Sequence, residues 1–86
     1  MLIKIPSNVT VAFDDTNGGL PALVLLHAFP LSREMWKPQR EALKPLARVL
    51  TPDLRGFGGT DIFDETTTIE VMADDVAGFL DAMNVN

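Results

Sequence analysis

The hydrophobic pattern of this chain is organised around a short apolar run, from Leu23 to Leu26, that ends at His27. A continuous apolar run of this length, bounded by turn-forming residues, predicts a strand buried on both faces in the middle of an α/β sheet. Ligands of such sheets bind beyond the carboxyl ends of the strands. We therefore expect a strand over residues 22–27 and place the segment that begins at His27 at the functional edge.

Two shorter segments before this run also have the pattern of strands. Residues 9–13 alternate apolar with polar or small side chains, which is typical of a half-buried strand, and residues 2–5 form a second apolar stretch that Pro6 ends. The intervening Ser7 and Asn8 are suited to a tight turn. An antiparallel hairpin at the N-terminus is therefore expected.

A helix and a further strand are predicted after the central run. Pro38 fits the first position of a helix over residues 38–46, and Ser32 is a suitable cap for the turn before it. A strand follows at residues 48–52, so strand, helix and strand predict a parallel pair joined by a right-handed crossover. The expected core-facing side chains are Trp36, Leu43 and Leu46, and those expected in water are Lys37, Arg40, Glu41 and Lys44.

A second helix is predicted near the C-terminus. Thr67, with Glu70 three residues later, matches a capping box, and Thr68 lies between them. Apolar residues then recur at helical spacing, which predicts one core-facing stripe. The stripe consists of Ile69, Met72, Ala73, Val76, Leu80 and Met83, and the residues expected in water are Asp74, Asp75 and Asp81.

The loop over residues 53–61 is rich in glycine but does not match a phosphate-binding motif. It contains no lysine, as a Walker loop requires, and it does not open directly into a helix, as a dinucleotide fingerprint does. The glycines are better explained by tight turns, and Asp53 and Arg55 are expected to form a local ion pair or to hold the loop.

Composition excludes several classes of function. Twelve acidic and seven basic residues give a net charge of −5, which disfavours nonspecific binding to nucleic acid or to an anionic membrane. The chain has no cysteine and one histidine, so thiolate chemistry and a zinc site are not expected, nor is a cofactor. With no signal peptide and no apolar span of membrane length, a cytoplasmic location is the expectation.

Three segments together resemble the α/β-hydrolase superfamily, in its order and with its spacing. The resemblance is closest to 3-oxoadipate enol-lactonases and related carboxylesterases. It implies a three-layer α/β/α fragment, with an N-terminal β-hairpin followed by a parallel βαβα unit, in which residues 1–86 form one incomplete domain. The segments are residues 25–30 with Trp36 six residues on, residues 52–61, and residues 68–76.

The resemblance also implies roles for the residues after the central strand. In the family, the backbone N–H that follows a His-Gly pair forms part of the oxyanion hole. That role corresponds to Phe29, and the family's glycine is Ala28 in this chain. Phe29 and Trp36 are candidates to line a substrate pocket. His27 is expected to order the neighbouring loop by hydrogen bonds rather than to act as a base or a metal ligand.

The chain lacks the Gly-x-Ser-x-Gly turn that carries the family's nucleophile, and its only serines are Ser7 and Ser32. The resemblance therefore corresponds to the N-terminal third of a hydrolase. One hypothesis is the N-terminal part of an ester or lactone hydrolase, whose site is completed by a separate chain that carries the missing strands or by a remainder of the same protein. A second is an inactive fragment that self-associates through residues 22–27. A third is a small module that binds an acyl ligand with residues 27–32 and 53–61.

Overall fold

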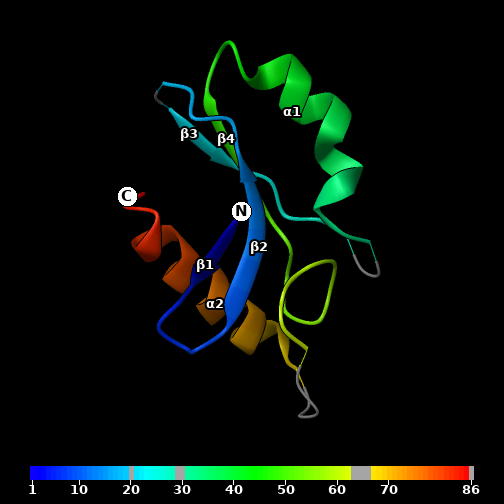
Figure 1. The fold of residues 1–86 in the computed structure, drawn as a ribbon, viewed down its shortest axis with the longest axis vertical. Coiled ribbons are helices and arrows are strands. Elements are labelled where there is room, and N and C mark those ends of the chain that lie inside the picture. The colour runs from blue at the N-terminus through cyan, green and yellow to red at the C-terminus, as the bar shows by residue number, and fades with distance from the viewer. Residues whose placement is uncertain (20, 29–30, 63–66, 86) are drawn as a thin grey trace.

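The computed structural model describes residues 1–19, 21–28, 31–62 and 67–85. Four strands form one mixed sheet in the order β1-β2-β4-β3, and Figure 1 shows the helices α1 and α2 on different sides of these strands. Within these ranges no helix is long and apolar enough to cross a membrane. The elements are β1 (Leu2–Lys4), β2 (Thr10–Asp15), β3 (Ala22–Val24), the 3₁₀ turn η1 (Arg33–Trp36), α1 (Lys37–Leu43), β4 (Arg48–Pro52) and α2 (Ile69–Ala82).

The strand pairing confirms the predicted hairpin and the predicted parallel pair. β1 and β2 are antiparallel, and the turn between them uses Asn8 at a φ of 73°, a conformation that asparagine tolerates. β3 and β4 are parallel, with Ala22 opposite Arg48. β2 also pairs antiparallel with β4, a contact for which the hydrophobic pattern contains no signal. The hairpin is therefore part of the main sheet.

The core lies between the sheet and α2. Phe79 is 1% exposed, and its ring meets that of Phe13 edge to face, with 5.2 Å between the centroids. By contrast, Ile69 is 77% exposed, so its expected place in the core is wrong. The helix turns Phe79, its largest apolar side chain, towards the sheet, which leaves the first part of the predicted stripe at the margin. The buried cluster consists of Ile5, Val9, Val11, Phe13, Leu50 and Phe79.

The N-terminus of α2 differs by one residue from the predicted capping box. Thr68 is the N-cap, and its hydroxyl accepts a hydrogen bond of 3.1 Å from the backbone N–H of Val71. The residue three positions after the cap is therefore Val71 and not Glu70. Thr68 supplies the side-chain cap of this helix.

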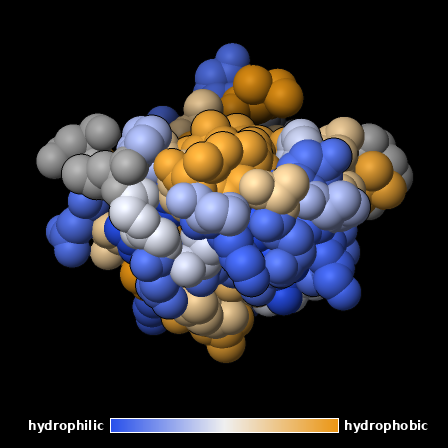
Figure 2. Space-filling view, turned by 90° about the horizontal axis from the view of Figure 1, so that it is seen from above, coloured by the Kyte–Doolittle hydropathy of each residue, from blue (hydrophilic) through white to orange (hydrophobic). Residues whose placement is uncertain are grey.

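The opposite face of the sheet is covered less completely. α1 ends at Leu43, three residues earlier than predicted, and the chain turns at Pro45. As a result Leu46 is 73% exposed, which corrects its expected burial, whereas the Arg40 side chain is only 13% exposed and pairs with Asp14 at 3.2 Å. Figure 2 shows the molecule from above the view of Figure 1, with an apolar patch within a largely polar surface.

β3 is an edge strand among the described residues, and it ends at Val24, three residues before the predicted end of the strand at His27. The exposure of its side chains corrects the predicted burial on both faces. Leu23 is 37% exposed and Leu26 is 44% exposed. β4 covers one edge of β3, and no described segment pairs with the other. The apolar composition of this strand is that of a buried strand, so its sequence and its surroundings disagree.

An ion pair between β2 and β4 makes the stability depend on pH. Arg48 donates hydrogen bonds of 2.8 and 3.2 Å to Asp15, and they hold the pKa of this carboxyl below its ordinary value of 3.8. This contribution is fully present above pH 3.8 and is lost as the pH falls through the lowered pKa of the folded state. We expect urea unfolding to show a smaller difference in stability between wild type and Asp15→Asn at about pH 2.5 than at about pH 6. A difference independent of pH would contradict this linkage.

Candidate functional site at the carboxyl ends of β3 and β4

Because β3 and β4 are parallel neighbours, the segments that follow them meet at the same edge of the sheet. His27 follows β3 and is 4% exposed. Its Nε2 accepts a hydrogen bond of 2.8 Å from the backbone N–H of Leu54, just after β4. A nitrogen that accepts from an N–H carries no proton, so the neutral ring is protonated on Nδ1, which donates to the Ala28 carbonyl oxygen at 3.1 Å. The ring also packs edge to face on Phe57.

Asp53 is the buried carboxylate of this edge, with an exposed fraction of 1%. It accepts hydrogen bonds from the backbone N–H of Arg33 at 2.6 Å and of Gly59 at 2.9 Å. The guanidinium of Arg33 donates a third and forms an ion pair with it. Asp53 therefore joins β4, η1 and the glycine-rich loop. Of the two expectations for Asp53, that it holds the loop is confirmed, and that it pairs with Arg55 is wrong.

The glycines of the loop leave the space that Asp53 occupies. Gly58 has a φ of +53°, and a Cβ at this position would lie 2.7 Å from Asp53 Oδ1. A Cβ at Gly59 would lie 2.9 Å from the Cβ of Ala12. Both contacts are shorter than side-chain atoms tolerate, so the loop requires glycine at 58 to close over the carboxylate and at 59 to lie against Ala12.

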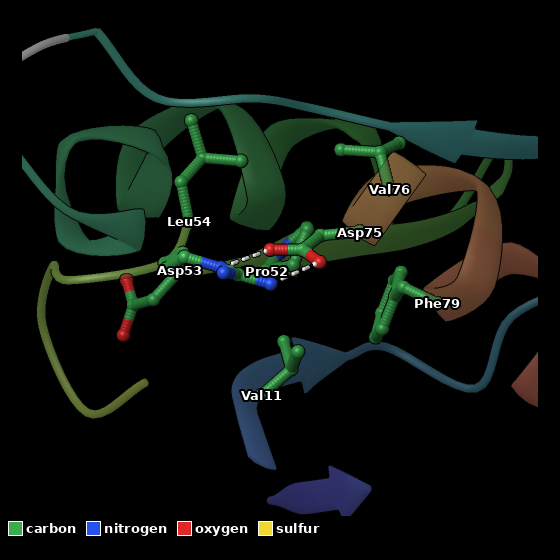
Figure 3. A pocket seen from close by; sticks show the side chains of 8 residues that line it. Val11, Pro52, Asp53, Leu54, Asp75, Val76 and Phe79 are labelled. Carbon is green, nitrogen blue, oxygen red and sulfur yellow. Dashed lines mark hydrogen bonds and ion pairs between the residues drawn. The ribbon is translucent and has the colours of Figure 1, made fainter. Parts of the chain in front are cut away.

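Arg55 pairs instead with Asp75 of α2, at 2.8 and 2.9 Å. Asp75 also accepts a hydrogen bond of 3.1 Å from the Ser7 hydroxyl and is 6% exposed, so its predicted position in water is wrong. Figure 3 shows the carboxylate of Asp53 pointing away from that of Asp75, and dashed lines mark the interactions of Asp75. Sequence reasoning missed this bridge because helical periodicity does not reveal a partner on a distant loop.

Two consecutive residues, Asp53 and Leu54, hold the two ends of the segment between β3 and η1. Leu54 binds His27 at one end, and Asp53 binds Arg33 at the other. Within the segment, the N–H of Leu31 donates to the Ala28 carbonyl oxygen at 2.8 Å. Ala28 itself is exposed, and its N–H donates to Met35 Sδ at 3.2 Å.

Two of the predicted site residues remain predictions. Phe29, the expected oxyanion donor, lies outside the described residues. Trp36 is partly buried in η1, and its Nε1 has no hydrogen-bond partner among the residues that the structure describes. Among all the residues that the structure describes, no three His, Asp or Glu side chains converge as metal ligands would.

An apolar hollow of about 410 Å³ lies beside His27, between the segment that follows β3 and the first part of α2. We call it the β3–α2 groove. It contains the exposed side of the helical stripe that was predicted to face the core. Its lining consists of Leu26, His27, Leu54, Ile69, Met72, Ala73 and Val76.

Comparison with known proteins identifies the class to which this fold and site belong. A family model described as alpha/beta hydrolase fold matches residues 21–86. 3-Oxoadipate enol-lactonase 1 from Acinetobacter baylyi is 42% identical over 65 residues, which cover 76% of this chain and 24% of the lactonase. Epoxide hydrolase 1 from Siraitia grosvenorii is 38% identical over 80% of this chain and 23% of its own length. The chain belongs to the α/β-hydrolase fold family.

A solved structure extends the likeness to nearly all of the chain. A thermophilic esterase from Thermogutta terrifontis is 45% identical and superposes with a TM-score of 0.89 over 98% of this chain and 32% of the esterase. The enol-lactonase from Burkholderia xenovorans is 27% identical, with a TM-score of 0.86 over 98% of this chain and 33% of its own. The chain therefore spans about a quarter to a third of the length of these relatives.

Proposed function

We propose that this chain is the N-terminal portion of an α/β-hydrolase that acts on carboxylic ester or lactone bonds. The observation that carries the proposal is the segment between β3 and η1, which hydrogen bonds to Leu54 and Asp53 fix at both ends. This segment lies at the carboxyl edge of parallel strands, where α/β proteins bind their ligands. The identities of 42% to an enol-lactonase and 45% to an esterase favour this substrate class.

In this proposal the backbone N–H of Phe29 stabilises the reaction's developing charge. When a nucleophile attacks an ester carbonyl, the carbon–oxygen double bond opens and its oxygen becomes negative. A preorganised N–H donor lowers the energy of that oxyanion without reorganising during the reaction. The bonds that fix His27 and Arg33 would provide this preorganisation, and Trp36 and Phe29 would contact the acyl group.

The other half of the chemistry has to come from a second polypeptide segment. Neither Ser7 nor Ser32 has the surroundings of a nucleophile, since Ser7 donates to Asp75 and Ser32 caps η1. The partner's serine oxygen would attack the carbonyl while a histidine, oriented by the acid, takes the serine proton and then gives it to the departing alcohol or enol. Water that the same histidine deprotonates would attack the acyl-enzyme, and the ester bond to serine would break to release the carboxylic acid and restore the serine hydroxyl. The chain alone is expected to be inactive.

Reconstitution tests the proposed function. The chain would be co-expressed with the two thirds of the Thermogutta terrifontis esterase that it does not match. We expect the assembly to hydrolyse p-nitrophenyl acetate and a serine-directed inhibitor to abolish the activity, whereas the chain alone releases no p-nitrophenol. An assembly that forms but hydrolyses only an epoxide such as styrene oxide, or neither substrate, would contradict the proposal.

A further inference from the structure

We infer that Met35 is an oxidation site that controls the segment between β3 and η1. In the reduced protein its thioether sulfur accepts a backbone hydrogen bond from this segment, and oxidation to the sulfoxide by a peroxide removes that bond. The inference concerns the structure of the segment, whereas any effect of the oxidation on catalysis rests on the proposed function.

The sulfur of Met35 contacts the residue that directly follows His27. The backbone N–H of Ala28 donates to Met35 Sδ at 3.2 Å. Met35 itself is held in η1, where its N–H donates to the Ser32 carbonyl oxygen at 3.1 Å. The sulfur therefore joins η1 to Ala28 through a contact that is separate from those of His27 and Asp53.

This contact is easily lost, because a thioether sulfur is a weaker hydrogen-bond acceptor than oxygen or nitrogen. The carbonyl oxygen of the same residue, Ala28, has stronger partners, since it accepts from the Leu31 N–H at 2.8 Å and from His27 Nδ1 at 3.1 Å. The bond from the Ala28 N–H to sulfur is therefore the part of this residue's hydrogen bonding that a chemical change of Met35 alters directly.

Met35 is open to an oxidant. The chain has four methionines, of which Met35 is 36% exposed and Met1 is 59% exposed, whereas Met72 and Met83 are partly buried. A peroxide has to reach the sulfur, so the exposed methionines are the expected targets. The backbone of Met1 pairs with Phe13 of β2, so Met1 serves as the control for oxidation of an exposed methionine outside the segment.

The oxidation transfers two electrons from sulfur to the peroxide. A lone pair of Met35 Sδ attacks one oxygen of hydrogen peroxide, the O–O bond breaks, and an S–O bond forms. The departing hydroxide takes the proton of the transferred oxygen and leaves as water. The sulfur is thereby oxidised to the sulfoxide, and the peroxide is reduced.

The sulfoxide does not keep the contact of the thioether. The sulfur has given one of its lone pairs to the new oxygen, and the side chain has changed from apolar to polar. Because Met35 is already partly exposed, the polar group turns towards water, and the Ala28 N–H exchanges its sulfur partner for water. Ala28 directly precedes Phe29, so in the proposed function the oxidation would weaken the preorganisation of the oxyanion donor.

Amide hydrogen exchange in the chain treated with hydrogen peroxide tests the inference. Peptide mapping by mass spectrometry locates the added oxygen, and NMR follows the exchange of single amides. Oxidation of Met35 should make the Ala28 amide exchange about two- to tenfold faster, the range for loss of one hydrogen bond. The Leu25 amide, which donates to the Leu50 carbonyl oxygen at 3.0 Å, should not change. Treatment with methionine sulfoxide reductases should restore the slower exchange.

A matched pair of variants, Met35→Leu and Met1→Leu, separates the sulfur contact from oxidation elsewhere. Leucine has a volume similar to that of methionine, but it can neither accept an N–H nor be oxidised. Met35→Leu should therefore show the faster Ala28 exchange before any treatment and no response to peroxide. Met1→Leu should respond to peroxide as the wild type does.

Each of three results would overturn the inference: Met35 stays reduced while Met1 is oxidised, the Ala28 exchange is the same before and after oxidation of Met35, or the Leu25 amide accelerates as much as that of Ala28. The last result would mean that oxidation unfolds the whole chain. These readouts need no ester substrate, so they are separate from the proposed function. A responsive Ala28 amide together with an assembly that lacks esterase activity would retain the oxidation site and remove the proposed function, and an unresponsive amide with an active assembly would do the opposite.

Discussion

Replacing Asp53 by alanine is expected to lower the free energy of unfolding by about 3 kcal/mol, because each buried N–H group that loses its acceptor costs about 1–3 kcal/mol. The carboxylate is 1% exposed and accepts hydrogen bonds from two backbone N–H groups as well as from the Arg33 guanidinium. The variant leaves those donors without their acceptor and releases η1 from the glycine-rich loop. Urea unfolding followed by circular dichroism measures the loss.

The matched control for Asp53→Ala is Asp74→Ala. Asp74 is an exposed residue of α2, so its removal should change the stability by no more than about 0.5 kcal/mol. Gly58→Ala should destabilise in the same direction as Asp53→Ala, because its Cβ would occupy the space of the Asp53 carboxylate. Similar stabilities of the Asp53 and Asp74 variants would show that the buried carboxylate does not organise this edge of the sheet.

Replacing Phe79 by alanine is expected to cost about 3–5 kcal/mol, as truncation of a buried phenylalanine usually does. The ring is 1% exposed and makes the edge-to-face contact with Phe13 that joins α2 to β2. Its removal leaves a cavity in the middle of the core cluster, which α2 covers on one side only. Urea unfolding and the near-ultraviolet circular dichroism of the aromatic rings measure the effect.

Ile69→Ala is the control on the same helix. Its side chain is 77% exposed, so the substitution should cost no more than about 0.5 kcal/mol in the chain alone. The periodicity of the sequence predicts the reverse for Ile69, which belongs to the expected core stripe. A larger loss for Ile69→Ala than for Phe79→Ala would mean that α2 packs with the face that the periodicity predicts.

The candidate site was predictable where a local pattern specifies a local structure. The apolar run that ends at His27 indicated a strand and the edge of the sheet at which the candidate site lies, and Ser32 was identified as a cap for the following turn. The bond between His27 and Leu54 joins residues 27 positions apart, so no sequence window contains it. The ion pair of Arg55 with Asp75 was not predicted from the sequence for the same reason. In addition, each of these charges considered alone is typical of a solvated surface.

The sequence by itself determined the order of the elements, the hairpin, the parallel pair and the resemblance to α/β-hydrolases. All of these depend on turn-forming residues, caps and apolar periodicity, which act over a few neighbouring positions. Only the tertiary structure decided which face of α2 is buried, which charges are paired inside, and that β2 joins β4. These outcomes depend on which side chains, distant in the sequence, compete for the same space in the fold. Phe79 and Asp75 are buried because of the contacts that they make with such distant residues.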